Sequence, residues 1–209
     1  MKLTSTSFAD NGRISEEYAF CVPDPGSRIN LGKNRNPQLA WTELPMGTRS
    51  LVLICHDPDV PCVPDDVNQE GRTISASLPR IDFYHWLLVD LQPQSGGIEA
   101  GEFSDGVTAR GKSGPQGPRG TRQGINDYTA WFANTEEMKG NYYGYDGPCP
   151  PWNDEIVHHY VFTLYALDLE QLPVSGTFRG ADVLNAMRGH VLGEASITGR
   201  YSLNPDVPA

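Results

Sequence analysis

The sequence lacks long apolar runs and is poor in basic residues. No stretch among the 209 residues approaches ~18 consecutive apolar residues, about the length that a helix needs to cross a bilayer. Its 16 Lys and Arg stand against 26 Asp and Glu, which gives a formal net charge of −10. Such a surface repels nucleic acid and anionic lipid. We therefore expect neither a transmembrane segment nor a nucleic-acid partner.

Cysteine is also scarce, and its arrangement does not indicate disulfides. Cys21, Cys55, Cys62 and Cys149 are unevenly spaced and form no C-x-x-C pair, unlike the framework of a small disulfide-rich domain. The N-terminal residues MKLTSTSFADNG lack the apolar core of a signal peptide. These absences predict a soluble protein of a reducing compartment, by default the cytoplasm.

Long helices are a third absence. The 22 Gly and 17 Pro interrupt the chain too often for long helices and are typical of short strands joined by turns. The continuously apolar run at 50–55 predicts a strand buried on both faces. Further strands are predicted at 3–8, 16–22, 83–91 and 197–201, with a surface loop at 23–37.

Only residues 182–192 predict a helix. Asp182 is a favourable N-cap, and Val183, Leu184, Met187 and Val191 fall on one face at helical spacing. Strands separated by turns, with one helix near the C-terminus, predict a mainly β fold, either a sandwich or a barrel-like arrangement. The length suits a single domain over residues 1–209.

The stretch 144–167 has two different halves. The first half contains Gly144, Gly147 and three prolines, so it predicts a rigid loop. The second half is rich in β-branched and aromatic residues and predicts a strand. Because alternate side chains of a strand share a face, His158 and Tyr160 point the same way. A rigid loop that leads into an imidazole and a phenol predicts the wall of a small pocket.

Residues 106–113, Gly-Val-Thr-Ala-Arg-Gly-Lys-Ser, fit the nucleotide-binding pattern G-x-x-x-x-G-K-S by letter. A nucleotide loop needs a buried strand before it and a helix after it. The residues before it, 99–105, are polar, and those after it, 114–120, are rich in Gly and Pro. We therefore interpret the stretch as a flexible, locally basic loop and expect no cofactor.

The stretch 57–61, Asp-Pro-Asp-Val-Pro, has two interpretations. Its aspartates can close a turn by accepting backbone amides, or they can orient and charge a nearby imidazole. It lacks the Gly and Glu that an EF-hand loop needs at fixed positions. Asp57, His85 and His158 would make a zinc site only if they converged, and no ligand spacing indicates one. No metal is expected.

Nucleophilic catalysis has little support in the sequence. The G-x-S-x-G motif of serine hydrolases is absent. Cys149 and His158 are a conceivable nucleophile and base, but the flanking prolines remove the amide that an oxyanion hole would use. We predict a protein without catalytic residues. The alternative is a small-molecule hydrolase that uses the His and Asp residues as acid and base.

Four motifs, in this order, resemble the signature of the phosphatidylethanolamine-binding protein family, and the likeness is closer to its bacterial, Raf-kinase-inhibitor-like branch. They are Asp-Pro-Asp-Val-Pro at 57–61, Tyr-His-Trp-Leu at 84–87, Gly-Pro-Cys-Pro-Pro at 147–151 and His-x-Tyr at 158–160. Supporting matches at 36–41, 124–128 and 189–192 extend the likeness over nearly the whole chain. The resemblance implies an antiparallel β-sandwich with few short helices, a small anion pocket and a homodimer.

The resemblance also implies pocket residues, at the positions that match the family's motifs. The expected ligand-binding residues are Asp57, Asp59, His85, Gly147, Pro148, Cys149, Pro150, Pro151, His158 and Tyr160. Val60 and His159 depart from the alanine and arginine that are usual in the family, and residues 152–157 are more acidic than the usual linker. Residues 129–143 resemble an insertion that would cover the pocket mouth and alter what enters.

The function implied is non-catalytic binding of a phosphate-type or zwitterionic headgroup, such as phosphoethanolamine. Imidazolium, phenol and loop amide groups would contact the anion, and the aspartates would hold the imidazoles protonated. Affinity would then rise as the pH falls. The resemblance further implies modulation of a partner such as a kinase or a protease. A third interpretation is an interaction protein with a vestigial pocket.

Overall fold

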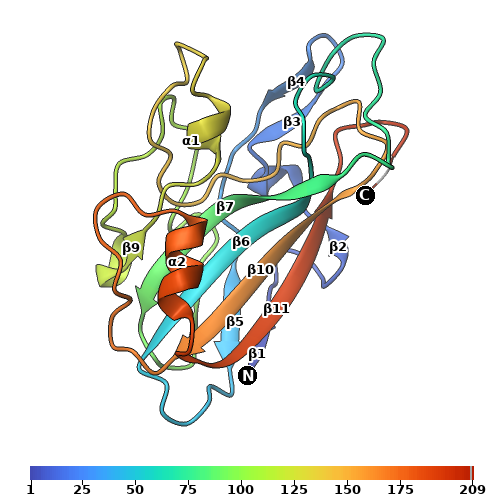
Figure 1. Ribbon diagram of the computed structural model, residues 1–209. Coiled ribbons are helices and arrows are strands. Elements are labelled where there is room, and N and C mark those ends of the chain that lie inside the picture. The colour runs from blue at the N-terminus through green and yellow to red at the C-terminus, as the bar shows by residue number, and fades with distance from the viewer. Residues whose placement is uncertain (208) are drawn as a thin grey trace.

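The computed structural model describes residues 1–207 and 209, and its framework is two facing β-sheets (Figure 1). The larger sheet has the strand order β2-β11-β10-β6-β7-β9, and the smaller sheet has the order β1-β5-β8. The strands pair antiparallel throughout, apart from the parallel contact of β2 with β11. The expected antiparallel β-sandwich is confirmed.

The elements have the following bounds. The larger sheet contains β2 (Gly12–Arg13), β6 (Ser50–Pro61), β7 (Arg80–Leu91), β9 (Arg122–Gln123), β10 (His158–Leu167) and β11 (Val191–Tyr201). The smaller sheet contains β1 (Lys2–Thr4), β5 (Leu39–Thr42) and β8 (Gly96–Ile98), and a separate hairpin contains β3 (Cys21–Asp24) and β4 (Arg28–Leu31). The helices are η1 (Glu16–Tyr18), η2 (Pro118–Gly120), α1 (Tyr128–Trp131) and α2 (Gly180–Met187).

Strand β6 divides the core into two parts, because both of its faces are buried. Leu51 and Leu53 belong to the large cluster that lies between the two sheets. Val52 and Ile54 belong to a second cluster on the other face, where α2 contributes Val183 and covers the sheet (Figure 1). The continuously apolar run therefore forms a strand buried on both faces, as predicted.

Helix α2 is shorter than the predicted helix at 182–192. It ends at Met187, Gly189 adopts a φ of +85°, and the chain then enters β11 at Val191. The N-cap is Arg179 and not Asp182. Asp182 occupies the third helical position, and its carboxylate accepts the backbone amide of Arg179 at 2.8 Å. Pairing of β11 with β10 thus overrides the helical spacing of the apolar residues.

The predicted strand at 16–22 and the predicted loop at 23–37 are both partly wrong. The first region begins as η1, and the second contains most of the β3–β4 hairpin. The carboxylate of Asp24 closes the hairpin turn by accepting the backbone amides of Gly26 at 2.9 Å and Ser27 at 2.7 Å. Local side-chain hydrogen bonds of this kind favour turns. The hairpin stands beyond the edge of the main sheets, next to α1 (Figure 1).

Other strand boundaries also differ from the prediction: β7 begins at Arg80 rather than at residue 83, and β11 begins at Val191 rather than at residue 197. Strand β1 ends at Thr4 rather than at residue 8, whereas β6 continues beyond Cys55 to Pro61. Its extension pairs with β7 through irregular registers at Cys55/His56 and at Asp57/Val60. Such bulges change the direction of side chains, and here they lie next to Asp57.

Within residues 1–207 and 209, no helix has the length and apolar character needed to cross a membrane.

Candidate functional site

A cavity of about 380 Å³ lies where the extended end of β6, the beginnings of β7 and β10, the β3–β4 hairpin and α1 come together. The four predicted motifs therefore converge in space. Seven of the ten predicted residues line the cavity, namely Asp57, His85, Cys149, Pro150, Pro151, His158 and Tyr160. The other three, Asp59, Gly147 and Pro148, do not line it.

His158 is the centre of a buried ion network. Its Nδ1–H donates to Asp57 Oδ2 at 2.7 Å, and its Nε2–H donates to Asp154 Oδ2 at 3.2 Å. Burial alone would lower the pKa of His158, but the Asp57 and Asp154 carboxylates together raise it to about 9. Arg80 contacts the same Asp154 oxygen at 2.5 Å. His158 is thus charged, and neither of its N–H groups is free for a ligand.

His85 is in the opposite state. Its Nδ1–H donates to the backbone carbonyl of Asp146 at 2.7 Å, which leaves Nε2 with a lone pair. Burial lowers the pKa of His85 to about 4, although the nearby Asp57 carboxylate opposes the shift. The expectation that both imidazoles are protonated is therefore wrong at neutral pH. His85 Nε2 is an acceptor and not a donor.

Tyr160 supplies the remaining polar group of the cavity wall. Its hydroxyl is buried, and no hydrogen-bond partner for it exists within the described part of the chain. Its ring stands edge-on to the His85 ring, with the centroids 5.1 Å apart. Burial raises the pKa of Tyr160 well above its ordinary value, so the hydroxyl keeps its proton. A buried hydroxyl without a partner is costly, and a ligand oxygen would satisfy it.

The two aspartates of the 57–61 motif have different roles. Asp57 Oδ1 accepts the amide of Asp59 at 2.8 Å, while its Oδ2 binds His158. Both interpretations of the motif are thus realised by one side chain. Asp59 turns away and accepts both the backbone amide and the Nδ1–H of His159, at 2.9 and 2.8 Å. It shapes the end of β6 but does not line the cavity.

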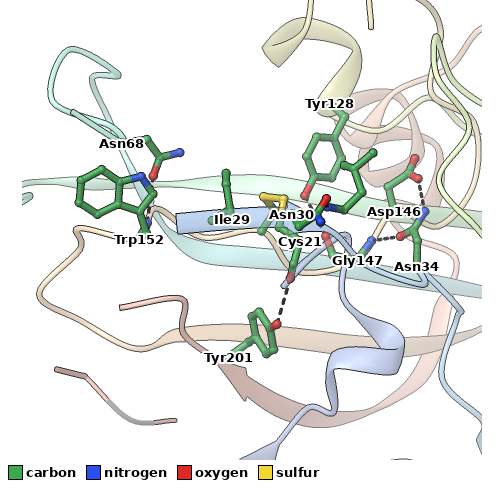
Figure 2. The surroundings of a disulfide bond; sticks show 12 residues. Cys21, Ile29, Asn30, Asn34, Asn68, Tyr128, Asp146, Gly147, Trp152 and Tyr201 are labelled. Carbon is green, nitrogen blue, oxygen red and sulfur yellow. Dashed lines mark hydrogen bonds between the residues drawn. A yellow bond between two sulfur atoms is a disulfide. The ribbon is translucent and has the colours of Figure 1, made fainter. Parts of the chain in front are cut away.

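Cys21 and Cys149 form a disulfide in the cavity wall (Figure 2). The prediction that the cysteines are unpaired is wrong, because a separation of 128 residues says nothing about proximity in space. The bond ties β3 to the Gly-Pro-Cys-Pro-Pro loop, and a pairing of Cys149 with His158 as nucleophile and base is excluded in this oxidised state. Cys55 and Cys62 are free thiols. Because a disulfide is present, the uneven spacing of the cysteines no longer supports the prediction of a reducing compartment.

Gly147 and Pro148 do not line the cavity, but their backbone hydrogen bonds hold the loop that does. The Gly147 amide donates to Asn34 Oδ1, and its carbonyl accepts the Tyr128 hydroxyl, both at 2.8 Å (Figure 2). A Cβ at this glycine would lie 2.1 Å from the Tyr18 carbonyl oxygen, so only glycine fits. The Pro148 carbonyl accepts the amides of residues 20 and 21. These bonds hold the loop against the hairpin.

Sequence reasoning missed four residues that support the site: Arg80, Lys112, Asp146 and Asp154. Lys112, from the stretch that imitates a nucleotide loop, contacts the buried Asp146 carboxylate at 2.6 Å. The carbonyl of the same Asp146 fixes the His85 tautomer. No short motif marks any of these residues, because each acts through a partner that is distant in sequence. The basic loop therefore helps to position His85 through the contact of Lys112 with Asp146.

Three residues of the segment 129–143 line the cavity, and whether the segment is an insertion stays a prediction. Trp131, Phe132 and Met138 line it together with groups from the hairpin. They leave about 380 Å³ open, so this segment forms a wall and does not fill the pocket.

Comparisons with known proteins identify the family and the fold. The family described as phosphatidylethanolamine-binding protein matches residues 4–202. A UPF0098 protein of Methanothermobacter thermautotrophicus is 34% identical over 96% of this chain and 98% of the relative. The UPF0098 protein YbhB of Escherichia coli is 32% identical over 97% of this chain and 100% of its own. The crystal structure of E. coli YbcL, called a new member of the mammalian PEBP family, superimposes with a TM-score of 0.67 at 25% identity, covering 96% of this chain and 97% of YbcL.

Proposed function

Because this chain belongs to the phosphatidylethanolamine-binding protein family, we propose that its cavity binds a phosphate-type or zwitterionic headgroup without converting it. The observation that carries the proposal is the pair of unused polar groups in the cavity wall. Tyr160 offers an O–H donor without a partner, and His85 Nε2 offers an acceptor. A ligand that brings both an anionic oxygen and an N–H group satisfies both.

The charges favour a zwitterion over a bare phosphate dianion. Among the described residues that line the cavity, His158 is the only cation, and the Asp57 and Asp154 carboxylates already neutralise it. A dianion would meet no unpaired cation there, and burying an unpaired charge costs free energy. A phosphoethanolamine group is neutral overall when its phosphate carries one charge. Its ammonium would donate to His85 Nε2, and a phosphate oxygen would accept from Tyr160.

The lining chemistry supports binding rather than hydrolysis. Among the described residues that line the cavity there is no serine or threonine, and both cysteines are joined in the disulfide. A hydrolase would have to activate water with His85 as the base. In a panel of phosphoester and carboxylic ester substrates we expect no turnover above the buffer rate. Turnover that disappears in Tyr160→Phe would instead support the hydrolase alternative.

Removal of the Tyr160 hydroxyl tests the headgroup proposal. We expect Tyr160→Phe to weaken phosphoethanolamine binding by about 10- to 100-fold, because a hydrogen bond to a charged oxygen contributes about 1.5–3 kcal/mol. Isothermal titration calorimetry at pH 5 measures the effect, because the phosphate monoester, with a second pKa of about 6, then carries one charge and His85, with a pKa of about 4, is still mostly neutral. Tyr165→Phe is the matched control, because Tyr165 lies on the opposite face of the same strand. Equal affinities of the wild type and Tyr160→Phe would contradict the proposal.

Inorganic phosphate is expected to bind more tightly as the pH falls below 7, for two reasons. The phosphate dianion becomes a monoanion near pH ~7, and His85 Nε2 gains a proton as the pH approaches its pKa of about 4. His158 keeps its proton throughout this range, because its pKa is about 9.

Three further expectations stay predictions from the sequence and the resemblance. They are the modulation of a kinase or a protease, a homodimer and a cytoplasmic location.

A further inference from the structure

We propose that the outer face of the larger sheet carries a second anion-binding site, at Arg13 and Arg200, which takes a doubly charged oxyanion such as sulfate or a phosphate group. The outer face is the face against which α2 packs (Figure 1). Neither arginine lines the cavity of about 380 Å³. The proposal therefore goes beyond the proposed function and does not depend on it.

The sheet register places the two arginines on neighbouring strands. Arg13 of β2 is the register partner of Arg200 of β11, and Arg200 is also the partner of His159 of β10. His159 shares its face of β10 with Tyr165, which packs against the apolar cluster beneath α2. All three basic side chains therefore lie on the outer face. The side chains of Arg13 and His159 are 59% and 43% exposed, so this end of the face is open to a ligand.

The guanidinium group of Arg200 lacks a partner. Its Nε is buried and has no acceptor. Arg35 and Arg80 also have a buried Nε without an acceptor, but each of them forms ion pairs with carboxylates. Arg200 forms neither an ion pair nor a side-chain hydrogen bond with any residue that the structure describes. A buried donor without an acceptor costs free energy, and an oxyanion would supply the acceptor.

The nearby carboxylates do not neutralise this pair of charges. Asp59 accepts the Nδ1–H of His159 at 2.8 Å, and Asp10 accepts a backbone amide of β11 at 2.9 Å. Glu16 lies 3.8 Å from Arg13, which is beyond hydrogen-bond distance. Like charges on neighbouring strands repel each other. The two arginines therefore destabilise this edge of the sheet unless an anion lies between them.

Two arginine side chains suit an oxyanion that carries two charges. A guanidinium group binds such anions through two parallel N–H···O bonds, which would include the Nε–H of Arg200. A groove of about 910 Å³ begins at Arg13 and is also lined by the hairpin turn at 23–28, Trp152 and residues 202–205. The groove has room for the rest of a phosphate monoester. The site can therefore take a free oxyanion or a phosphate group on a small molecule.

Sulfate is the probe that separates this site from the cavity, where a dianion meets no unpaired cation. It is titrated at constant ionic strength, and NMR spectra follow the backbone amides of residues 12–14 and 198–201. We expect these resonances to shift until the site is saturated. Arg200→Gln should weaken sulfate binding by about 10- to 100-fold, as loss of a hydrogen bond to a charged group does. Arg200→Lys keeps the charge but not the paired donors, so its affinity should fall between the two.

Arg188→Gln is the matched control, because Arg188 is the exposed C-cap residue of α2 and its replacement removes the same charge. It should leave sulfate binding unchanged, and so should Tyr160→Phe, which alters the cavity alone. Sulfate also stabilises proteins without binding to a site. Its specific effect is therefore the difference between variants: sulfate should raise the thermal unfolding midpoint of the wild type more than that of Arg200→Gln.

Equal sulfate affinities of the wild type and Arg200→Gln, or amides of residues 12–14 and 198–201 that do not shift, would overturn the proposal, whatever the cavity binds. Sulfate binding that is lost in Tyr160→Phe and retained in Arg200→Gln would place the anion in the cavity, with the same consequence. Inorganic phosphate and glucose 6-phosphate, both titrated into Tyr160→Phe at pH 8, distinguish the sources of the anion. Equal affinities indicate a free oxyanion, and tighter binding of the ester indicates a phosphate group on a larger molecule.

Discussion

Loss of the Cys21–Cys149 disulfide is expected to lower the free energy of unfolding by about 5 kcal/mol. The bond joins residues 128 positions apart, and the chain-entropy cost of an unfolded loop grows with its length, to about 4.7 kcal/mol near 100 residues. Urea unfolding of the wild type with and without dithiothreitol measures the effect. The Cys21→Ser/Cys149→Ser double variant should match the reduced wild type and should not respond to the reductant.

Cys62→Ser is the control for this experiment, because Cys62 is an exposed free thiol. Its unfolding midpoint should equal that of the wild type and should shift by the same amount when the reductant is added. A reduced wild type with an unchanged midpoint would show that the disulfide does not form or does not constrain the unfolded chain. Either result would contradict the prediction.

The same bond is expected to matter for ligand binding. It holds β3, and with it the wall that contains Ile29 and Leu31, against the Gly-Pro-Cys-Pro-Pro loop. The Phe20 and Cys21 amides also donate to the Pro148 carbonyl of this loop, and the Tyr201 hydroxyl, from β11, donates to the Cys21 carbonyl at 2.9 Å (Figure 2). Reduction of the disulfide is therefore expected to loosen the wall formed by the β3–β4 hairpin and to leave the wall formed by β6, β7 and β10 in place.

Stability is expected to pass through a maximum near pH 6.5 as far as the two buried histidines determine it. The folded protein keeps a proton on His158 that the unfolded chain releases above pH 6.5, because the pKa is raised from 6.5 to about 9. Its stabilisation is complete below pH 6.5 and is lost as the pH rises to 9. The difference corresponds to about 3 kcal/mol.

The acid side has the opposite cause. The unfolded chain takes up a proton on His85 below pH 6.5, whereas burial holds the folded pKa near 4. Stability therefore falls by about 3 kcal/mol between pH 6.5 and 4. Urea unfolding from pH 4 to 9.5 measures both sides of the maximum. A free energy of unfolding that does not change between pH 7 and 9 would contradict the assignment of His158 as a buried cation.

His158→Gln tests which group controls the alkaline side. It should destabilise the protein by about 3–5 kcal/mol at pH 7, because Asp57 loses its cation while buried, and it should remove the decline between pH 6.5 and 9. His159→Gln is the matched control, since His159 lies on the other face of β10 and is half exposed. If His158→Gln does not fold, an NMR titration of the wild type should still give a His158 pKa near 9.

Several features of the fold and the site could be predicted from the sequence. The apolar run at 50–55 and the alternation from His158 to Phe162 identify central strands and their buried faces, because side-chain direction in a strand depends on local geometry. The four motifs also identify seven residues that line the cavity. The extension of β6 beyond residue 55 and the early end of α2 could not be predicted, because pairing with neighbouring strands determines where each of them ends.

Local patterns in the sequence were enough to identify the central strands and the alternation of their side chains, because spacing along a strand controls which way its side chains point. The contacts between distant segments became known only from the folded chain. These are the Cys21–Cys149 disulfide, the bonds of Asp154 to His158 and Arg80, and the bond of the Asp146 carbonyl to His85. The charged state of one imidazole and the neutral state of the other follow from these contacts and from burial, which sheet register and bulges control.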